Sequence, residues 1–96
     1  MGAVVDRVVE ELNGRMKGKA FDGIARIVLT GEGSVIVDRA GAREGDDEAD
    51  VTLTASPDVF QQIVAGELDA TAAFMTGKLT LDGDMGRAMQ LAQILG

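Results

Sequence analysis

The residues that could do acid–base or metal chemistry in this chain are few. The 96-residue sequence contains no histidine and no cysteine, which removes the commonest general base, the commonest metal ligand and every thiolate. Among the carboxylates, Asp82 and Asp84 stand closest to a pair, and such a pair works only in one cleft with separated pKa values. Asp82 falls at an outward position of an expected strand, and Asp84 suits a helix N-cap. We therefore predict that the chain is not an enzyme and has no catalytic residue.

Three further fragments suggest ligand sites but lack the required spacing. Thr76–Thr80, TGKLT, does not match the longer glycine-rich loop that cradles phosphates. Gly31 and Gly33 fall in an expected hairpin turn, whereas a dinucleotide fingerprint lies between a strand and a helix. The acidic run at 44–50 lacks the glycine and distal glutamate of an EF-hand loop. We expect no cofactor and no metal.

A set of methionine and phenylalanine side chains is the remaining candidate for a ligand site. It comprises Phe60, Phe74, Met75, Met85 and Met89. Spacing alone favours ordinary core positions. Methionine is also suited to surfaces that accept several ligands, because its unbranched thioether repacks easily. The pattern by itself leaves both interpretations open.

Hydrophobic periodicity predicts the elements that must position these residues. Apolar residues from Val4 to Met16 follow helical spacing, and Ser56 with Pro57 is typical of a helix start. Leu79 and Leu81 alternate with polar neighbours, as in a half-buried strand. The expected elements are a helix at 4–16, strands at 24–30 and 35–38, a strand at 51–55, helices at 57–66 and 69–76, a strand around 79–82 and a final helix from 84 onward.

This order, α-β-β-β-α-α-β-α, predicts a single α+β domain over residues 1–96. The sheet should be largely antiparallel, with its first three strands forming a meander and the helices on one face. We expect the acidic stretch at 40–50 to be a solvated loop, because like charges so closely spaced disfavour regular structure.

The charge pattern excludes several partners. Nine basic residues are dispersed among sixteen acidic ones, giving a formal net charge of −7, which argues against nucleic acid. No apolar run approaches the roughly 20 residues of a transmembrane segment. The N-terminus lacks the features of a secretion signal. We expect a cytoplasmic location.

The stretch from Asp50 to Leu91 resembles the sterol carrier protein 2 family. The matching positions are Ser56-Pro57-Asp58, Gly66-Glu67-Leu68, Ala73-Phe74, Gly77-Lys78-Leu79, Gly83-Asp84-Met85-Gly86 and Ala88-Met89. They follow one another in register without gaps, and the first half of the chain agrees in element order. The resemblance thus covers essentially the whole domain and indicates a small stand-alone member.

The resemblance implies a five-stranded sheet with a hydrophobic tunnel between sheet and helices that binds fatty acids, fatty acyl-CoA, sterols or other lipids. The fifth strand should lie near 39–43 or in the tail, so the sheet has four to five strands. Longer members close part of the tunnel with residues beyond the end of this chain, which leaves open whether the site is a tunnel or a groove. Resemblance and periodicity together predict these lining residues: Phe60, Ile63, Phe74, Leu81, Met85 and Met89.

The function implied is non-catalytic binding of an apolar lipid ligand. The alternative is an accessory or homodimeric interaction domain that uses the same apolar groove to hold a lipid-like intermediate for a partner enzyme.

Overall fold

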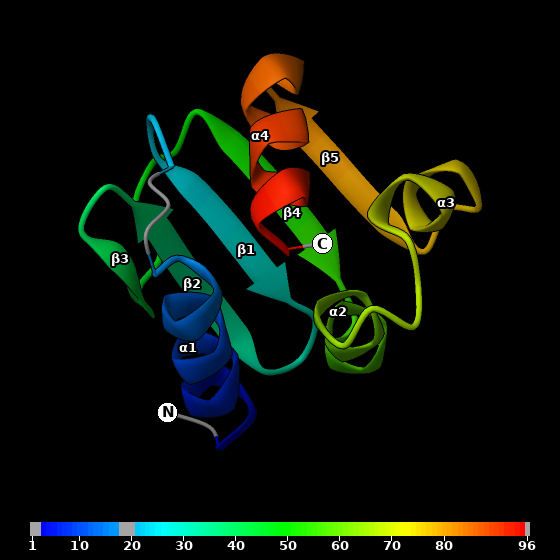
Figure 1. The fold of residues 1–96 in the computed structure, drawn as a ribbon, viewed down its shortest axis with the longest axis horizontal. Helices are drawn as coiled ribbons and strands as arrows, with labels where there is room; N and C mark the ends of the chain where they lie inside the picture. The colour runs from blue at the N-terminus through cyan, green and yellow to red at the C-terminus, as the bar shows by residue number, and fades with distance from the viewer. Residues whose placement is uncertain (1–2, 18–20, 96) are drawn as a thin grey trace.

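The computed structural model describes residues 3–17 and 21–95 and contains helices and strands in the order shown in Figure 1. The elements are α1 (Ala3–Arg15), β1 (Ala25–Leu29), β2 (Gly33–Asp38), β3 (Gly41–Glu44), β4 (Val51–Ala55), α2 (Pro57–Val64), α3 (Ala70–Met75), β5 (Leu79–Gly83) and α4 (Met85–Leu95). The expected α+β class is confirmed, and every expected element is present with small shifts of its bounds.

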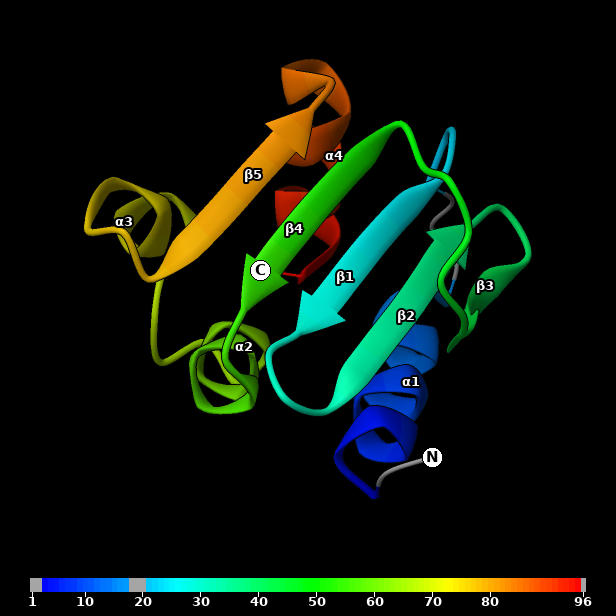
Figure 2. The same cartoon turned by 180° about the vertical axis from the view of Figure 1, so that it is seen from behind.

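The five strands form one sheet in the order β3-β2-β1-β4-β5. The pairs β1–β2, β2–β3 and β4–β5 are antiparallel, so the sheet is largely antiparallel as predicted. The pair β1–β4 is parallel, with Ile27 opposite Leu53. The prediction that residues 51–55 close an antiparallel meander was therefore wrong. The connection from β3 crosses the sheet before β4 begins, so β4 runs in the direction that a meander would give it but pairs with β1 instead of β2 (Figure 2).

The fifth strand, β3, lies within the stretch that we expected to be a loop. Its position agrees with the region near 39–43 that the family resemblance suggested. Ala42 is the buried residue of this strand, and its backbone exchanges hydrogen bonds with the Asn13 side chain of α1, at 3.0 and 2.9 Å. Hairpin pairing with β2 and this anchor outweigh the local charge, which affects only the residues after Glu44.

The four helices of the described residues lie on the same side of the sheet, which Figures 1 and 2 show from opposite sides. Val5, Val8 and Leu12 of α1 are buried against β2 and β3, while α4 lies over β1, β4 and β5. The Ser56 hydroxyl caps α2 by accepting from the Val59 backbone N–H, as the Ser-Pro pair predicted. The core therefore lies between the sheet and this single layer of helices.

The opposite face of the sheet is without helices in the part of the chain that the structure describes. The crossing segment at 45–50 runs over it and covers Ile36, which is fully buried although it points away from the helices. This segment gives the acidic run a structural role: it spans β2 and β1 to deliver the chain to β4.

Candidate functional site

An apolar pocket of about 170 Å³ lies between α3, β5 and α4. Ten residues line it: Leu53, Ala70, Thr71, Phe74, Leu79, Leu81, Met85, Ala88, Met89 and Ala92. Thr71 is the one member of this lining with a polar side chain, and no lining residue is charged. The pocket can therefore hold hydrocarbon, and its walls offer no acid, base or nucleophile beyond one threonine hydroxyl.

The alternation of β5 and the register of β4 build the floor of the pocket. Leu79 and Leu81 point toward the helices, whereas Thr80 and Asp82 point to the other face. Leu81 lies directly opposite Leu53 of β4 in the antiparallel ladder. Three leucine side chains thus form a continuous apolar floor under the gap between α3 and α4.

Helix α4 forms one wall of the pocket, and its position depends on the cap before its first turn and on the helical spacing of its apolar residues. The Asp84 carboxylate caps the helix by accepting from the Gly86 and Arg87 backbone N–H groups at 2.9 and 3.2 Å, as the sequence predicted. Met85, Ala88, Met89 and Ala92 then fall on the side facing α3. The alanines are small, so the two helices approach the floor without filling the space between them.

An ion-pair cluster holds the start of α4 against two loops. Arg87 lies 3.7 Å from both Asp22 and Asp50 and 4.0 Å from Asp84, and it also donates to the Asp22 carbonyl. Asp50 in turn accepts from the Ile24 backbone N–H at 3.0 Å. The cation of α4 is therefore directed away from the pocket and is shared among carboxylates.

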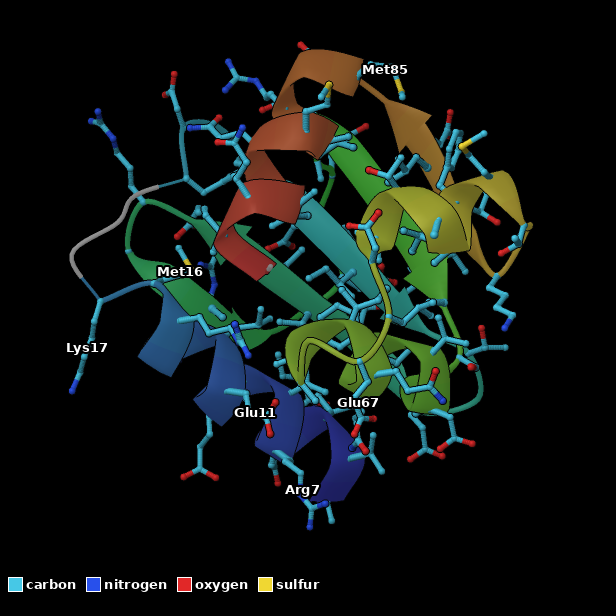
Figure 3. The ribbon with its side chains drawn as sticks, turned by 45° about the vertical axis from the view of Figure 1, so that its right-hand side comes forward. Arg7, Glu11, Met16, Lys17, Glu67 and Met85 are labelled. Carbon is cyan, nitrogen blue, oxygen red and sulfur yellow. The ribbon has the colours of Figure 1, made fainter. Side chains whose placement is uncertain are left out.

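The mouth of the pocket is formed by large apolar side chains that water reaches. Phe74 is 41% exposed, Met85 51% and Met89 65%. Figure 3 shows Met85 where β5 ends and α4 begins. The leucines of the pocket floor are far less exposed, Leu53 at 2% and Leu79 at 3%, so the rim side chains are not core positions. Flexible methionines at an open rim can move to admit or release a ligand.

The structure brings four of the six predicted lining residues to this pocket, namely Phe74, Leu81, Met85 and Met89. The other two, Phe60 and Ile63, are buried core side chains of α2 and lie outside its lining. Leu79, Ala88 and Ala92 belong to the lining but were missed, although they share the strand and helix periodicity of Leu81 and Met85. Leu53 could not be inferred without the β4–β5 register.

A second crevice of about 220 Å³ adjoins the pocket at the α2–α3 turn. It is lined by Ile63, Gly66, Leu68, Asp69, Ala70, Thr71 and Ala92, of which Ala70, Thr71 and Ala92 also line the pocket. Ile63 thus lies beside the pocket rather than in it. Asp69 is the single charged residue of this lining, and its carboxylate caps α3 by accepting from the Ala72 backbone N–H at 3.2 Å.

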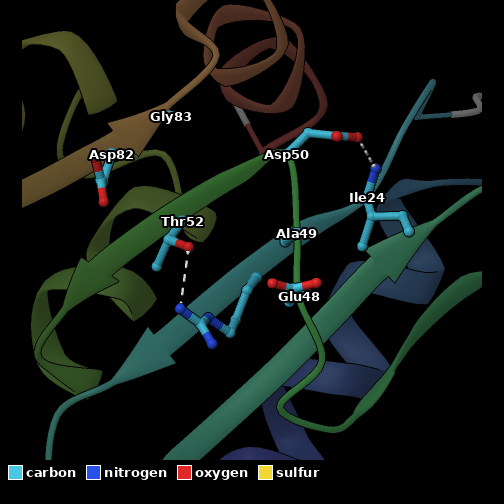
Figure 4. A pocket seen from close by; sticks show the side chains of 8 residues that line it. Ile24, Glu48, Ala49, Asp50, Thr52, Asp82 and Gly83 are labelled. Atoms are coloured by element: carbon cyan, nitrogen blue, oxygen red, sulfur yellow. Dashed lines mark hydrogen bonds between the residues drawn. The ribbon is translucent and has the colours of Figure 1, made fainter.

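The face of the sheet opposite the helices has a larger hollow of about 480 Å³, but its lining is polar and charged (Figure 4). Arg26 lies in it and donates to Asp46 at 3.0 Å and to Thr52 at 3.4 Å. Asp50, Asp82 and Glu48 are also among the lining residues. A broad charged hollow gives an apolar ligand no shelter from water, so we take the smaller apolar pocket as the candidate site.

The shifted pKa of Asp38 belongs to a carboxyl group that lies away from the pocket. The Arg43 guanidinium donates to Asp38 at 2.7 Å and holds the pKa of that carboxyl below its usual range. Asp38 lies on β2, which β1 and β4 separate from β5 in the sheet, and its ion pair with Arg43 joins β2 to β3. Within the described residues, no helix is long and apolar enough to cross a bilayer.

Comparison with known proteins gives consistent matches along the chain. The family model for the SCP-2 sterol transfer family matches residues 5–96. Hydroxysteroid dehydrogenase-like protein 2 of Xenopus laevis is 38% identical over 86 residues, which is 81% of this chain and 21% of that protein. Peroxisomal multifunctional enzyme A of Dictyostelium discoideum is 34% identical over 100 residues, which is 99% of this chain and 22% of that protein. The chain therefore spans about a fifth of the length of these two relatives.

A solved structure has the same fold. The solution structure of Sterol Carrier Protein-2 from Aedes aegypti in complex with palmitate matches with a TM-score of 0.82 and 22% identity, covering 100% of this chain and 97% of the other. At this identity the match establishes the common fold.

Proposed function

Because this chain belongs to the SCP-2 sterol transfer family, we propose that it binds an apolar lipid, without catalysis, in the pocket between α3, β5 and α4. The observation that carries the proposal is the lining itself: ten residues with a single polar side chain, opening to solvent through flexible apolar ones. A fatty acid, a fatty acyl-CoA or a sterol has the hydrocarbon to fill such a space. The Aedes aegypti protein of the same fold was solved with palmitate, which supports this choice.

The size of the pocket sets how much of a lipid it holds. At about 170 Å³ it lies below the roughly 300 Å³ typical of small-molecule sites, so a long chain would also occupy the adjoining crevice or displace the rim. Each buried methylene contributes about 0.8 kcal/mol, and about ten of them match a micromolar affinity before the entropic cost of binding is counted. A modest site is thus sufficient for reversible lipid binding.

We assign ligand contact to Phe74, Leu81, Met85 and Met89, which line the pocket, and to Ile63, which lines the crevice. Phe60 is fully buried, so it would contact a ligand that enters more deeply than the present pocket allows. Among the residues that the structure describes, no titratable side chain lines the pocket, which supports a binding role without bond making.

The decisive experiment compares two methionine substitutions of the same chemistry. We expect Met89→Asp to weaken binding of a neutral polarity-sensitive dye such as Nile red, and of lipids that displace it, by about tenfold or more, because a charge would enter an apolar lining. Met75→Asp is the matched control: Met75 is 79% exposed and lies outside the lining. Circular dichroism verifies that both variants fold.

Native mass spectrometry after gentle purification supplies an independent measurement. Co-purified lipid in the wild-type protein, absent from Met89→Asp, would agree with the proposal. A clean apo mass together with no uptake of dye or lipid would refute it, as would equal binding by folded Met89→Asp and Met75→Asp.

A second candidate function is an accessory domain that holds a lipid-like intermediate for a partner enzyme. It is favoured by the relatives, since the matched segment is about a fifth of proteins named as a dehydrogenase-like protein and a multifunctional enzyme. The exposed rim could also support a homodimer. Light scattering with and without lipid separates the two arrangements: a lipid-independent dimer favours the interaction domain. A cytoplasmic location stays a prediction that cell fractionation would test.

A further inference from the structure

Building on the proposed lipid-binding function, we propose that Arg87 is a positioning residue that controls access to the pocket. Its ion pairs hold the first turn of α4 against two loops on the other side of that helix. When these contacts are released, the turn can move outward and widen the mouth of the pocket. Arg87 lies outside the pocket lining, so it acts on a ligand only through the position of α4.

The closed pocket is too small for the ligands proposed above. At about 170 Å³ it holds only part of a long acyl chain, since small-molecule sites are typically roughly 300 Å³ or larger. The floor is fixed, because Leu53 and Leu79 lie in the β4–β5 ladder and are 2% and 3% exposed. The helices above the floor must therefore move when a lipid enters, and the first turn of α4 carries Met85 at the rim.

The two halves of α4 are attached to the rest of the molecule in different ways. Leu91 and Ile94, in the second half, are buried in the core. Among residues 85–89, in the first half, Ala88 is the only buried residue, and Met85 and Met89 are exposed at the rim. The apolar attachment of the first turn is thus small, and polar contacts have to supply the rest.

The first turn of α4 is also intrinsically weak as a helix. Gly86 lies within it, and glycine destabilises a helix relative to alanine. The Asp84 carboxylate compensates in part, because it accepts from the backbone N–H groups of Gly86 and Arg87 at 2.9 and 3.2 Å. The turn is therefore held mainly by this exposed cap and by the ion pairs of the Arg87 side chain.

The loop before β1 is shaped to receive that side chain. The Arg87 guanidinium lies 3.7 Å from the carboxylates of Asp22 and Asp50, and it also donates to the Asp22 carbonyl oxygen. Gly23 has a φ of +112°, and a Cβ atom at this position would lie 2.6 Å from Arg87 Nη1. A larger residue at position 23 would therefore displace the guanidinium, so the loop and the arginine fit each other closely.

The ion pairs are exposed enough to open. The side chains of Arg87 and Asp22 are 32% and 73% exposed, and exposed ion pairs contribute little individually. Between about 0.01 M and about 1 M NaCl the screening length falls from roughly 30 Å to roughly 3 Å, which is shorter than the 3.7 Å between the charges. We therefore expect ligand exchange to become faster in salt, whereas a purely hydrophobic effect of salt would slow dissociation.

The test measures the association and dissociation rates of Nile red by stopped-flow fluorescence in about 0.01 M NaCl. In Arg87→Gln both rates should rise roughly three- to tenfold, because opening of the turn precedes both entry and exit. The equilibrium affinity should change less than about twofold, since the same opening step affects both rates. In about 1 M NaCl the wild-type rates should approach those of the variant, and the variant should respond less to salt.

Two further variants separate the ion pairs from a general loss of stability. Asp22→Asn removes one carboxylate partner that lies outside the pocket lining, and it should raise both rates by a smaller factor than Arg87→Gln does. Arg43→Gln removes an ion pair that joins β2 to β3 and should leave both rates unchanged. Circular dichroism verifies that all three variants fold.

Amide hydrogen exchange measures the opening without any ligand. The Ala88 N–H donates to the Asp84 carbonyl oxygen at 3.0 Å and closes the first turn of α4, so its exchange should be roughly three- to tenfold faster in Arg87→Gln. The Met16 N–H is the matched control, because it donates to the Leu12 carbonyl oxygen at 2.9 Å at the end of α1. Its exchange should not change.

Each outcome decides one of the two proposals. Unchanged Nile red rates or unchanged Ala88 exchange in folded Arg87→Gln overturns the role of Arg87, as does an equal rise of the rates in Arg43→Gln. Faster dissociation alone, with weaker affinity, would reduce Arg87 to a support of the pocket wall and overturn it too. Failure of Nile red and of lipids to bind the wild-type protein instead overturns the proposed lipid-binding function, and Ala88 exchange then still decides whether Arg87 positions the turn.

Discussion

Helices α1 and α4 cover the same face of one sheet, yet they pack on it differently. The apolar residues of α1 that face the sheet, Val5, Val8 and Leu12, are at most 2% exposed. On α4, Leu91 and Ile94 are also buried, but Met85 and Met89 are 51% and 65% exposed, and a pocket of about 170 Å³ lies between that helix and α3. The two helices differ little in their amphipathic pattern. The helix layer is nevertheless closely packed where α1 covers β2 and β3 (the filled half), and it leaves a pocket where α3 and α4 cover β5 (the unfilled half).

Side-chain shape and helix spacing explain the difference. Valines and leucine on α1 are branched and fill the space above β2 and β3, and Asn13 ties the helix to the backbone of Ala42 on β3. In the other half, alanines of α3 and α4 face each other over the floor of β5, and methionines stand at the edge. A filled half supplies stability, while an unfilled half provides space for a ligand.

Truncation of one apolar residue in each half should give the largest contrast. Leu12→Ala removes a fully buried side chain and should lower the free energy of unfolding by about 2–5 kcal/mol. Met89→Ala removes one that is 65% exposed and should change it by no more than about 0.5 kcal/mol. Urea denaturation of both variants measures the difference. Comparable losses of unfolding free energy in the two variants would mean that the two halves are equally well packed and would contradict the difference described above.

Enlargement of one buried alanine in each half should have a smaller effect on stability and an opposite effect on binding. Ala42→Leu, under α1, should overpack the filled half and cost about 1–3 kcal/mol. Ala88→Leu places the same atoms against an open pocket, so the cost should stay below about 1 kcal/mol.

Ligand binding should also distinguish these two variants, but here the larger effect is expected for Ala88→Leu. Ala88→Leu occupies the space of about two ligand methylenes and should weaken the binding of Nile red, and of lipids that displace it, about tenfold, while Ala42→Leu should leave it unchanged. Calorimetric unfolding and dye displacement supply the two measurements. If Ala42→Leu blocked binding as strongly as Ala88→Leu did, the ligand site would not be confined to the unfilled half.

Local signals in the sequence predicted most of the fold. The Ser56 and Asp84 caps, the alternation of Leu79 and Leu81 and the stripe on α1 each depend on neighbours in the chain, and the structure confirms them. The parallel pairing of β4 with β1 depends instead on the path of residues 45–50 across the sheet. No local pattern encodes that path, so the expected meander was wrong.

The candidate site was predicted less completely, because a helical stripe marks an apolar face without naming the element that it meets. Phe60 and Met89 have the same signature in sequence, but α2 buries Phe60 completely and α4 leaves Met89 at a rim. Leu53 enters the pocket through its pairing with Leu81, which requires the strand register. Ala88 and Ala92 matter because they are small, and a search for large apolar side chains overlooks them.

The smallest expected effect concerns the ion pair of Asp38 and Arg43 in the filled half. The hydrogen bond from Arg43 lowers the pKa of Asp38 from its ordinary value of 3.8, so the pair stabilises the fold above that pH. This contribution should be lost as pH falls below 3.8 and Asp38 becomes protonated. Arg43 is 52% exposed, and the contribution should stay within about 1 kcal/mol.

Asp38→Asn should therefore lower stability slightly at pH 7 and flatten the acid limb of the stability curve, while Nile red binding stays unchanged. Arg43→Gln should give the same loss, and the double variant should lose no more than either single one, because both changes remove one interaction. Urea midpoints measured from pH 7 to pH 3 provide the test. Additive losses would show that Asp38 and Arg43 do not act as one interaction. Weaker Nile red binding in Asp38→Asn would show that the hairpin under α1 is coupled to the pocket and that the two halves are not independent.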